Sequence, residues 1–290
     1  MLKTKKTPGD TTWFVHDRFG LFIHWGLYAQ GARHEWLQNN EQIPPAEYEA
    51  RYLKRFDPDL YDPDRWARLA ANAGMKYFVI TTKHHEGFCL WDSKLTDYKA
   101  PNTAGKRDLL RPMIEAFRRQ NMRVGLYHSL IDWHHPDYVI DPHIGPLRNS
   151  PERAALNAKR DQARYAEYLH GQVRELLTKF GHIDILWCDF SYPRPDGTGK
   201  GRDDWQSKKL YAMIRKLQPK IILNDRLDLD TGWDIKTPEQ FQPRQWVRFN
   251  GEPVVWEACQ TFSGSWGYHR DEQSWKSVDQ LVQMLIDTVS

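Results

Sequence analysis

Short apolar runs alternate along the chain with longer stretches in which apolar residues recur at helical spacing. The runs, rich in β-branched and aromatic residues, predict buried strands at 19–26, 75–85, 122–129, 183–190, 220–226 and 252–259. The stretches between them predict helices over 63–74, 107–121, 151–181, 203–219 and 277–290. This order is typical of parallel β/α units, which close into a barrel or open into a doubly wound sheet.

Polar residues stand at or near the end of each predicted strand: His24, His84, His85, Tyr127, His128, Asp189, Asn224, Arg226 and Glu257. A β/α barrel presents such groups at the carboxyl ends of its strands, where its active site lies. No GxGxxG motif follows the first strand, which argues against a dinucleotide-binding sheet. We therefore predict an α/β fold, a (β/α)8-like (TIM-type) barrel. Six predicted strands leave that barrel incomplete at its C-terminus.

Length, charge, apolar runs and cysteine spacing limit which class of protein this chain can be. The 290 residues suffice for one large domain, and we expect a single catalytic domain over residues 1–290. Lys and Arg are scattered among Asp and Glu, and the net charge is +3, so no nucleic-acid surface is expected. No apolar run is long enough to predict a signal peptide or a membrane span, so we expect a cytoplasmic protein. Three cysteines without CxxC spacing do not indicate a disulfide framework.

The stretch LWCDF predicts an aromatic ring beside a carboxylate. Alternate residues of a strand share a face, so Trp187 and Asp189 point together and Cys188 points away. A carboxylate in this position suits a nucleophile that attacks a sugar carbon. Helix capping by Asp189, or an ion pair with Arg226, explains the same residue equally well.

The stretch VVWEAC places Glu257 after an apolar strand and next to Trp256. A carboxyl against tryptophan surfaces is partly desolvated, which raises its pKa and suits a general acid near neutral pH. One ionised and one protonated carboxyl are the minimum apparatus of glycoside hydrolysis.

Histidine pairs occur in KHHEGF and in DWHHPDY. The first is not an HExxH zinc motif, because no histidine lies four residues beyond His85. A histidine-rich metal site remains an alternative. For His24, His84 and His85, at two neighbouring strand ends, we favour hydrogen bonding to sugar hydroxyls.

Together the motifs resemble those of the α-L-fucosidases of glycoside hydrolase family 29. The matching pieces follow the family's order: GLFIHWGLYAQGARHEW, KHHEGFCLWDS, GLYHS, LWCDF, NDR and WEACQTFSGSWGY. The resemblance spans roughly residues 13–290. It implies a (β/α)8-like barrel and a retaining, double-displacement mechanism that uses neither a metal nor another cofactor.

The resemblance also implies roles for individual residues. Asp189 would be the nucleophile and Glu257 the acid/base, with Glu35 as the alternative acid/base or a ligand of a fucose hydroxyl. The remaining residues of the implied fucose pocket are His24, Trp36, His84, His85, Tyr127, Trp187, Arg226 and Trp266.

Two departures from the family pattern stand out. Phe190 follows the nucleophile where the family often has glycine, and we expect the C-terminal β-domain common in the family to be absent. An incomplete barrel would expose strand edges, which favour self-association.

The function expected from this resemblance is an exo-glycosidase that removes terminal α-L-fucose from a fucosylated glycan or oligosaccharide. The alternatives are a catalytically impaired carbohydrate-binding barrel and a metal-dependent hydrolase.

Overall fold

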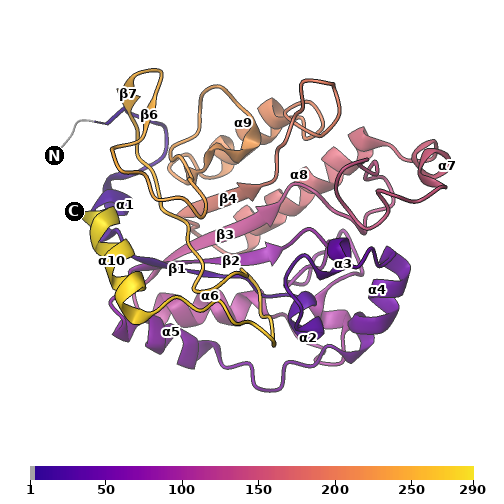
Figure 1. Cartoon of the computed structure of the whole chain (residues 1–290), viewed down its shortest axis with the longest axis horizontal. Coiled ribbons are helices and arrows are strands. Elements are labelled where there is room, and N and C mark those ends of the chain that lie inside the picture. Colours follow the sequence, from indigo (N-terminus) through magenta and orange to yellow (C-terminus); the bar gives the residue numbers. More distant parts are fainter. Residues whose placement is uncertain (1–3) are drawn as a thin grey trace.

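The computed structural model describes residues 4–290, and a parallel five-stranded sheet forms its centre (Figure 1). The strands pair in chain order and are β1 Gly20–Ile23, β2 Tyr77–Lys83, β3 Arg123–Ser129, β4 Ile185–Asp189 and β5 Ile222–Leu223. They confirm the first five predicted strands, although β5 is shorter than expected. Its predicted end is instead a 3-10 turn, Asp225–Leu227.

Isolated parallel bridges continue this ladder beyond β5. They join Asn224 to Ile235, Lys236 to Trp256, and Glu239 to Cys259. The segments 235–239 and 256–259 therefore take the places of two further strands of a β/α barrel.

The prediction of one strand over 252–259 was wrong. β7, Glu252–Pro253, instead pairs antiparallel with β6, Arg248–Phe249. Asn250 and Gly251 lie between them with φ of 51° and 81°. Asn-Gly with positive φ at both residues is a typical hairpin turn, and Pro253 cannot donate to a ladder. This hairpin separates the start of the predicted strand from the part that joins the parallel ladder.

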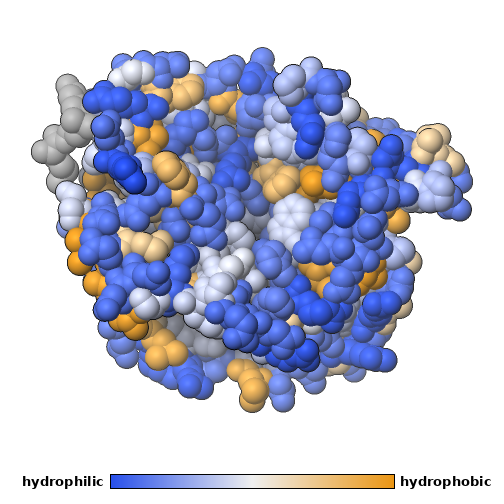
Figure 2. All heavy atoms as spheres, in the orientation of Figure 1, coloured by the Kyte–Doolittle hydropathy of each residue, from blue (hydrophilic) through white to orange (hydrophobic). Residues whose placement is uncertain are grey.

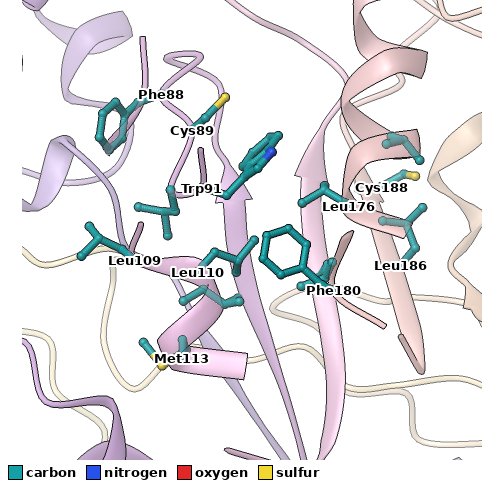
Figure 3. Packing of buried hydrophobic residues seen from close by; sticks show 14 of the residues in the cluster. Phe88, Cys89, Trp91, Leu109, Leu110, Met113, Leu176, Phe180, Leu186 and Cys188 are labelled. Atoms are coloured by element: carbon teal, nitrogen blue, oxygen red, sulfur yellow. The ribbon is translucent and has the colours of Figure 1, made fainter. Parts of the chain in front are cut away.

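Two hydrophobic clusters occupy the two faces of the sheet. Val79, Tyr127, Ile185, Trp187 and Ile222 pack on the inner face, together with Ile235 of the first added segment and Val255, which directly precedes the second. The alternate residues of the same strands pack outward against helices, as strand periodicity requires. Figure 3 shows part of this outer cluster, which includes Leu110, Met113, Leu176, Phe180, Leu186 and Cys188. The arrangement is that of a β/α barrel wall.

The helices that follow strands confirm the predicted β/α order. They are α5 Pro63–Asn72, α6 Leu110–Arg119, α7 Arg153–Asn157, α8 Gln162–Lys179, α9 Ser207–Leu217 and α10 Val278–Val289. The sequence did not predict the short helices near the N-terminus, which are α1 Thr12–Asp17, α2 Tyr28–Gly31, α3 Leu37–Asn40 and α4 Pro45–Tyr52.

The predicted helix over 151–181 is in fact two helices, α7 and α8. Asp161 begins the second, because its side chain accepts the backbone N–H groups of Ala163 and Arg164. An aspartate in this position satisfies donors that a helix leaves unpaired at its N-terminus. The capping aspartate therefore starts a new helix inside the predicted one.

The parallel ladder remains open on one side. Within residues 4–290, β1 pairs with β2 alone. A loop rather than a strand reaches β1 from the last ladder segment: the Trp266 ring stacks on His24, and the Gly267 N–H donates to Glu35. Arg33 and His269 add an antiparallel bridge. This loop joins the two sides of the sheet where the strands end.

The surface in Figure 2 is mostly hydrophilic, with apolar side chains in small separate groups. No helix formed by residues 4–290 has the length and apolar character that a membrane crossing needs. The three cysteines, Cys89, Cys188 and Cys259, are buried free thiols.

Candidate active site

An open cavity of about 410 Å³ lies at the carboxyl ends of the strands. All the predicted site residues line it except Glu35 and Glu257. Its lining consists of Phe22, His24, Trp36, His84, His85, Tyr127, Trp187, Asp189, Phe190, Arg226, Glu239, Cys259 and Trp266. Six of the nine polar residues that the sequence singled out at strand ends therefore meet here: His24, His84, His85, Tyr127, Asp189 and Arg226. The other three, His128, Asn224 and Glu257, do not line the cavity.

Asp189 is the last residue of β4, and its carboxylate faces the cavity. Trp187 lies on the same face and Cys188 packs in the outer cluster, which confirms the predicted alternation. The Tyr127 hydroxyl donates to Asp189 Oδ2 at 2.6 Å, and Arg226 Nη1 donates to Oδ1 at 3.0 Å. The ion pair that the sequence left as an alternative is thus part of the cavity itself.

The charge of Asp189 is set by opposing effects. The pKa of Asp189 is raised overall, because burial raises it more than Arg226 and the Tyr127 hydrogen bond lower it. Burial alone would lower the pKa of Arg226, but the charges of Asp189 and Glu239 raise it overall. A hydrogen-bonded carboxylate beside a guanidinium is stabilised in its ionised form, which a nucleophile requires.

We expect Tyr127→Phe to move the acidic limb of the kcat/KM profile to higher pH. The variant loses a hydrogen bond to ionised Asp189, so the pKa of Asp189 rises further and the carboxylate is protonated over a wider acidic range. A bond to a charged group contributes about 1.5–3 kcal/mol, so kcat/KM at neutral pH should fall about tenfold or more. Steady-state kinetics across pH would measure both effects.

Tyr61→Phe is the matched control, because the Tyr61 hydroxyl donates to the backbone oxygen of Leu109, outside the cavity lining. A Tyr127→Phe profile that coincides with the control's would contradict the expectation.

Three histidine rings converge, as predicted. The His84 centroid lies 5.8 Å from that of His24 and 4.0 Å from that of His85. Burial is the largest effect that lowers the pKa of both His24 and His85, and the proximity of the His84 imidazole lowers each further. His24 and His85 are therefore neutral and can exchange hydrogen bonds with hydroxyl groups.

Hydrogen bonding fixes the tautomer of His85. Its Nδ1 lies 2.7 Å from Ser129 Oγ, whose own proton goes to the backbone oxygen of Ile131. Ser129 must therefore accept the Nδ1–H of His85, so Nε2 carries no proton in the neutral ring. That Nε2 lies 3.8 Å from Asp189 Oδ2. Nε2 is placed to accept a hydrogen bond from a hydroxyl of a ligand beside the carboxylate.

Aromatic rings form the walls of the cavity. Trp266 stacks on His24 with centroids 5.2 Å apart, while Trp36 and Phe190 contact His85 at 5.0 Å each. Rings that enclose a few polar groups suit a ligand with apolar faces and several hydroxyls. A sugar ring has this character.

Phe190 forms part of the wall in an unusual backbone conformation. Its φ of 82° lies in the left-handed region, which a bulky residue rarely adopts. Such conformations cost about 1–3 kcal/mol and cluster at active sites. The glycine often found here in the family would adopt this φ without strain.

The two predicted carboxyl residues that do not line the cavity make protein contacts. Trp187 Nε1 donates to Glu257 Oε1, and burial raises the pKa of Glu257 to about 7. The direction of this shift is the one that the sequence predicted. Glu35 is 2% exposed, and its Oε2 accepts the Gly267 N–H at 2.8 Å.

Glu239 was missed by the sequence analysis. It lines the cavity, and its Oε2 accepts a hydrogen bond from Arg226 Nη2 at 2.8 Å. Arg226 thus holds Asp189 on one nitrogen and Glu239 on the other, with the two carboxylates on either side of one guanidinium. No local signal in the sequence marks Glu239, because the segment 235–239 that replaces a barrel strand carries no apolar run.

The second histidine pair makes other contacts. His134 Nε2 bonds Glu49 at 2.8 Å and its ring stacks on Tyr98, while His135 packs on Tyr168. Among residues 4–290, no group of three or more His, Cys, Asp and Glu side chains is arranged to hold a metal ion.

Known proteins resemble this chain over most of its length. The family profile described as Alpha-L-fucosidase matches residues 2–290. Alpha-L-fucosidase isoenzyme 1 from Paenibacillus thiaminolyticus is 47% identical, with a TM-score of 0.89 over 96% of this chain and 66% of its own. A GH29 alpha-L-fucosidase from Bacteroides thetaiotaomicron, trapped as a covalent intermediate with 2-fluoro-fucosyl fluoride, is 28% identical. Its TM-score is 0.80 over 98% of this chain and 68% of its own.

The tissue alpha-L-fucosidase of Rattus norvegicus is 28% identical over 96% of this chain. The match covers 60% of the rat protein, so the chain spans less than two thirds of that relative's length. The predicted (β/α)8-like fold class is confirmed by these structural relatives, together with the parallel β/α order of this chain. By the match of the family profile to residues 2–290, the chain belongs to the alpha-L-fucosidase family.

Proposed function

We propose that the protein hydrolyses terminal α-L-fucose with retention of anomeric configuration. The observation that carries this proposal is the carboxyl group of Asp189, which Tyr127 and Arg226 hold at the end of β4 in a cavity lined by histidines and tryptophans. The trapped covalent intermediate of the Bacteroides relative supports a mechanism that passes through a glycosyl-enzyme.

The reaction has two displacements. Asp189 attacks the anomeric carbon, a C–O bond forms to its carboxylate, and the bond to the leaving oxygen breaks. A second carboxyl group protonates that leaving oxygen. The resulting carboxylate then takes a proton from water, which attacks the anomeric carbon and releases fucose and the Asp189 carboxylate.

Two residues compete for the acid/base role. Glu257 has the pKa, about 7, that suits a general acid at neutral pH, but its carboxyl accepts from Trp187 and does not line the cavity. Glu239 lines the cavity and shares Arg226 with Asp189 through its Oε2, which leaves Oε1 to carry the proton that an acid donates. An acid must reach the oxygen that it protonates, so geometry comes before pKa. We therefore place Glu239 first, Glu257 second and the buried Glu35 third.

The substrate that we propose is a terminal fucose on a glycan or oligosaccharide. Stacked rings would hold the apolar face of the sugar, and His24, His84 and His85 would exchange hydrogen bonds with its hydroxyls. The cavity opens to solvent, so the rest of the substrate can remain outside it. This geometry favours removal of an end residue.

Proton NMR of the reaction with an aryl α-L-fucoside tests the proposal. We expect the α-anomer of fucose to appear first, before mutarotation, because two displacements retain the configuration. Initial release of the β-anomer would contradict the two-step mechanism. Calorimetric binding of fucose without any hydrolysis would contradict the enzymatic function and favour a carbohydrate-binding barrel.

A further inference from the structure

Glu86 is a buried carboxyl residue to which the proposed mechanism gives no role. It lies in the turn after β2, directly after the histidine pair, and is 2% exposed. Three buried tyrosines, Tyr28, Tyr48 and Tyr98, feel its charge. Burial is the largest effect that raises the pKa of each tyrosine, and the charge of Glu86 raises it further. Neither carboxylate oxygen has a hydrogen-bond partner within residues 4–290.

The imidazole of His84 faces this carboxylate. His84 Nδ1 lies 3.6 Å from Glu86 Oε2, and this nitrogen is also buried without a hydrogen-bond partner in the part of the chain that the structure describes. Unpaired buried polar groups are costly, and a buried charge is costlier still. A small movement would bring the His84 donor and the Glu86 acceptor into a hydrogen bond, and both groups would then be paired.

The acceptor determines which nitrogen of His84 carries the proton. A carboxylate can only accept, so when the two groups move within bonding distance Nδ1 is the donor and Nε2 is left bare in the neutral ring. The neighbouring His85 already makes such a bond at 2.7 Å, with Ser129 in place of the carboxylate. His128 repeats it, because Thr82 Oγ1 donates to the Tyr127 backbone oxygen and so accepts from His128 Nδ1.

We propose that Glu86 is a positioning residue that holds His84 in the Nδ1–H form, so that its Nε2 accepts a hydrogen bond from a hydroxyl of the bound sugar. The His84 ring lines the cavity, while Glu86 does not. This inference rests on the proposed function, since it assigns one hydroxyl of the sugar to His84. It differs from a role in packing, because it predicts a defined protonation state of one ring.

Glu86→Met removes the acceptor and keeps an unbranched side chain of similar length. We expect a roughly 10–100-fold loss of kcat/KM on an aryl α-L-fucoside, mostly through KM, since a bond to a hydroxyl away from the reacting centre contributes to ground state and transition state alike. Glu86→Gln keeps an acceptor oxygen and should recover part of the loss. Thermal unfolding of each variant would show whether it is folded.

Glu49→Met is the matched control. Glu49 also bonds a histidine, His134, at 2.8 Å, but neither residue lines the cavity. We expect this variant to keep the wild-type kcat/KM.

Nitrogen NMR of the imidazole rings reads the tautomer directly, with the His84 signals assigned from their loss in His84→Gln. In wild-type protein we expect His84 protonated at Nδ1, and in Glu86→Met a shift toward the Nε2–H form. An unchanged tautomer, together with kcat/KM equal to that of Glu49→Met, would overturn the proposal. If wild-type protein releases no fucose, the proposed function fails, whereas the tautomer and calorimetric fucose binding by Glu86→Met still test the pairing.

Discussion

Asp189→Ala is expected to lose turnover of an aryl α-L-fucoside by at least about 10⁴-fold, because no other group replaces a missing nucleophile. Azide is small enough to occupy the space of the deleted carboxylate. It should attack the anomeric carbon in place of Asp189 and yield fucosyl azide of inverted configuration. Chromatography and NMR of the product would identify that compound.

Asp184→Ala provides the control for this variant. Asp184 precedes β4 at the opposite end of the strand, and its Oδ2 accepts the Val124 N–H at 2.9 Å. Losing this buried contact should lower the midpoint of thermal unfolding, with no azide product. If Asp189→Ala behaves in the same way, with normal turnover per folded molecule, Asp189 is structural and the proposed mechanism is wrong.

The second large effect is expected for Glu239→Ala. A general acid contributes typically 10²–10⁴-fold, and only where the leaving group needs a proton. The variant should therefore lose about 10²–10⁴-fold on a fucoside with a poorly acidic alcohol as leaving group. It should lose far less on fucosyl fluoride or a dinitrophenyl fucoside. Steady-state kinetics on this pair of substrates would separate an acid from a residue that only binds the sugar.

Glu257→Ala in the same assay decides between the two carboxyl groups. If Glu239 is the acid, the Glu257 variant should lose activity equally on both substrates, because only the contact to Trp187 is removed. A leaving-group dependence confined to Glu257→Ala would transfer the role to Glu257 and contradict the assignment made from the cavity. A matching loss confined to Glu35→Ala would do the same for Glu35.

Hydrophobic periodicity predicted the elements that are long or strongly patterned. The strands β2, β3 and β4 are buried along most of their length, so their sequences read as continuous apolar runs. Because parallel strands place their carboxyl ends at one edge, His84, Tyr127 and Asp189 could be expected to meet there. The sequence thus predicted most of the cavity lining.

Hydrophobic periodicity could not predict the last part of the parallel ladder. The segment 235–239 joins its neighbours through isolated bridges and includes Lys236 and Pro238, so no apolar run marks it. Glu239 was missed for that reason. The orientation of Glu257 and Glu35 depends on Trp187 and on the loop at Gly267, which are distant in sequence. Contacts of this kind are set by tertiary packing rather than by local pattern.

The left-handed backbone at Phe190 has a consequence for engineering this cavity. β-branched and most bulky residues rarely adopt that conformation, so few residues can replace Phe190 without added backbone strain. Glycine is the first of them. A glycine would widen the pocket and at the same time make the backbone next to Asp189 more flexible. A substitution at position 190 therefore changes the substrate range and the rigidity of the reacting carboxylate together, and neither can be changed there alone.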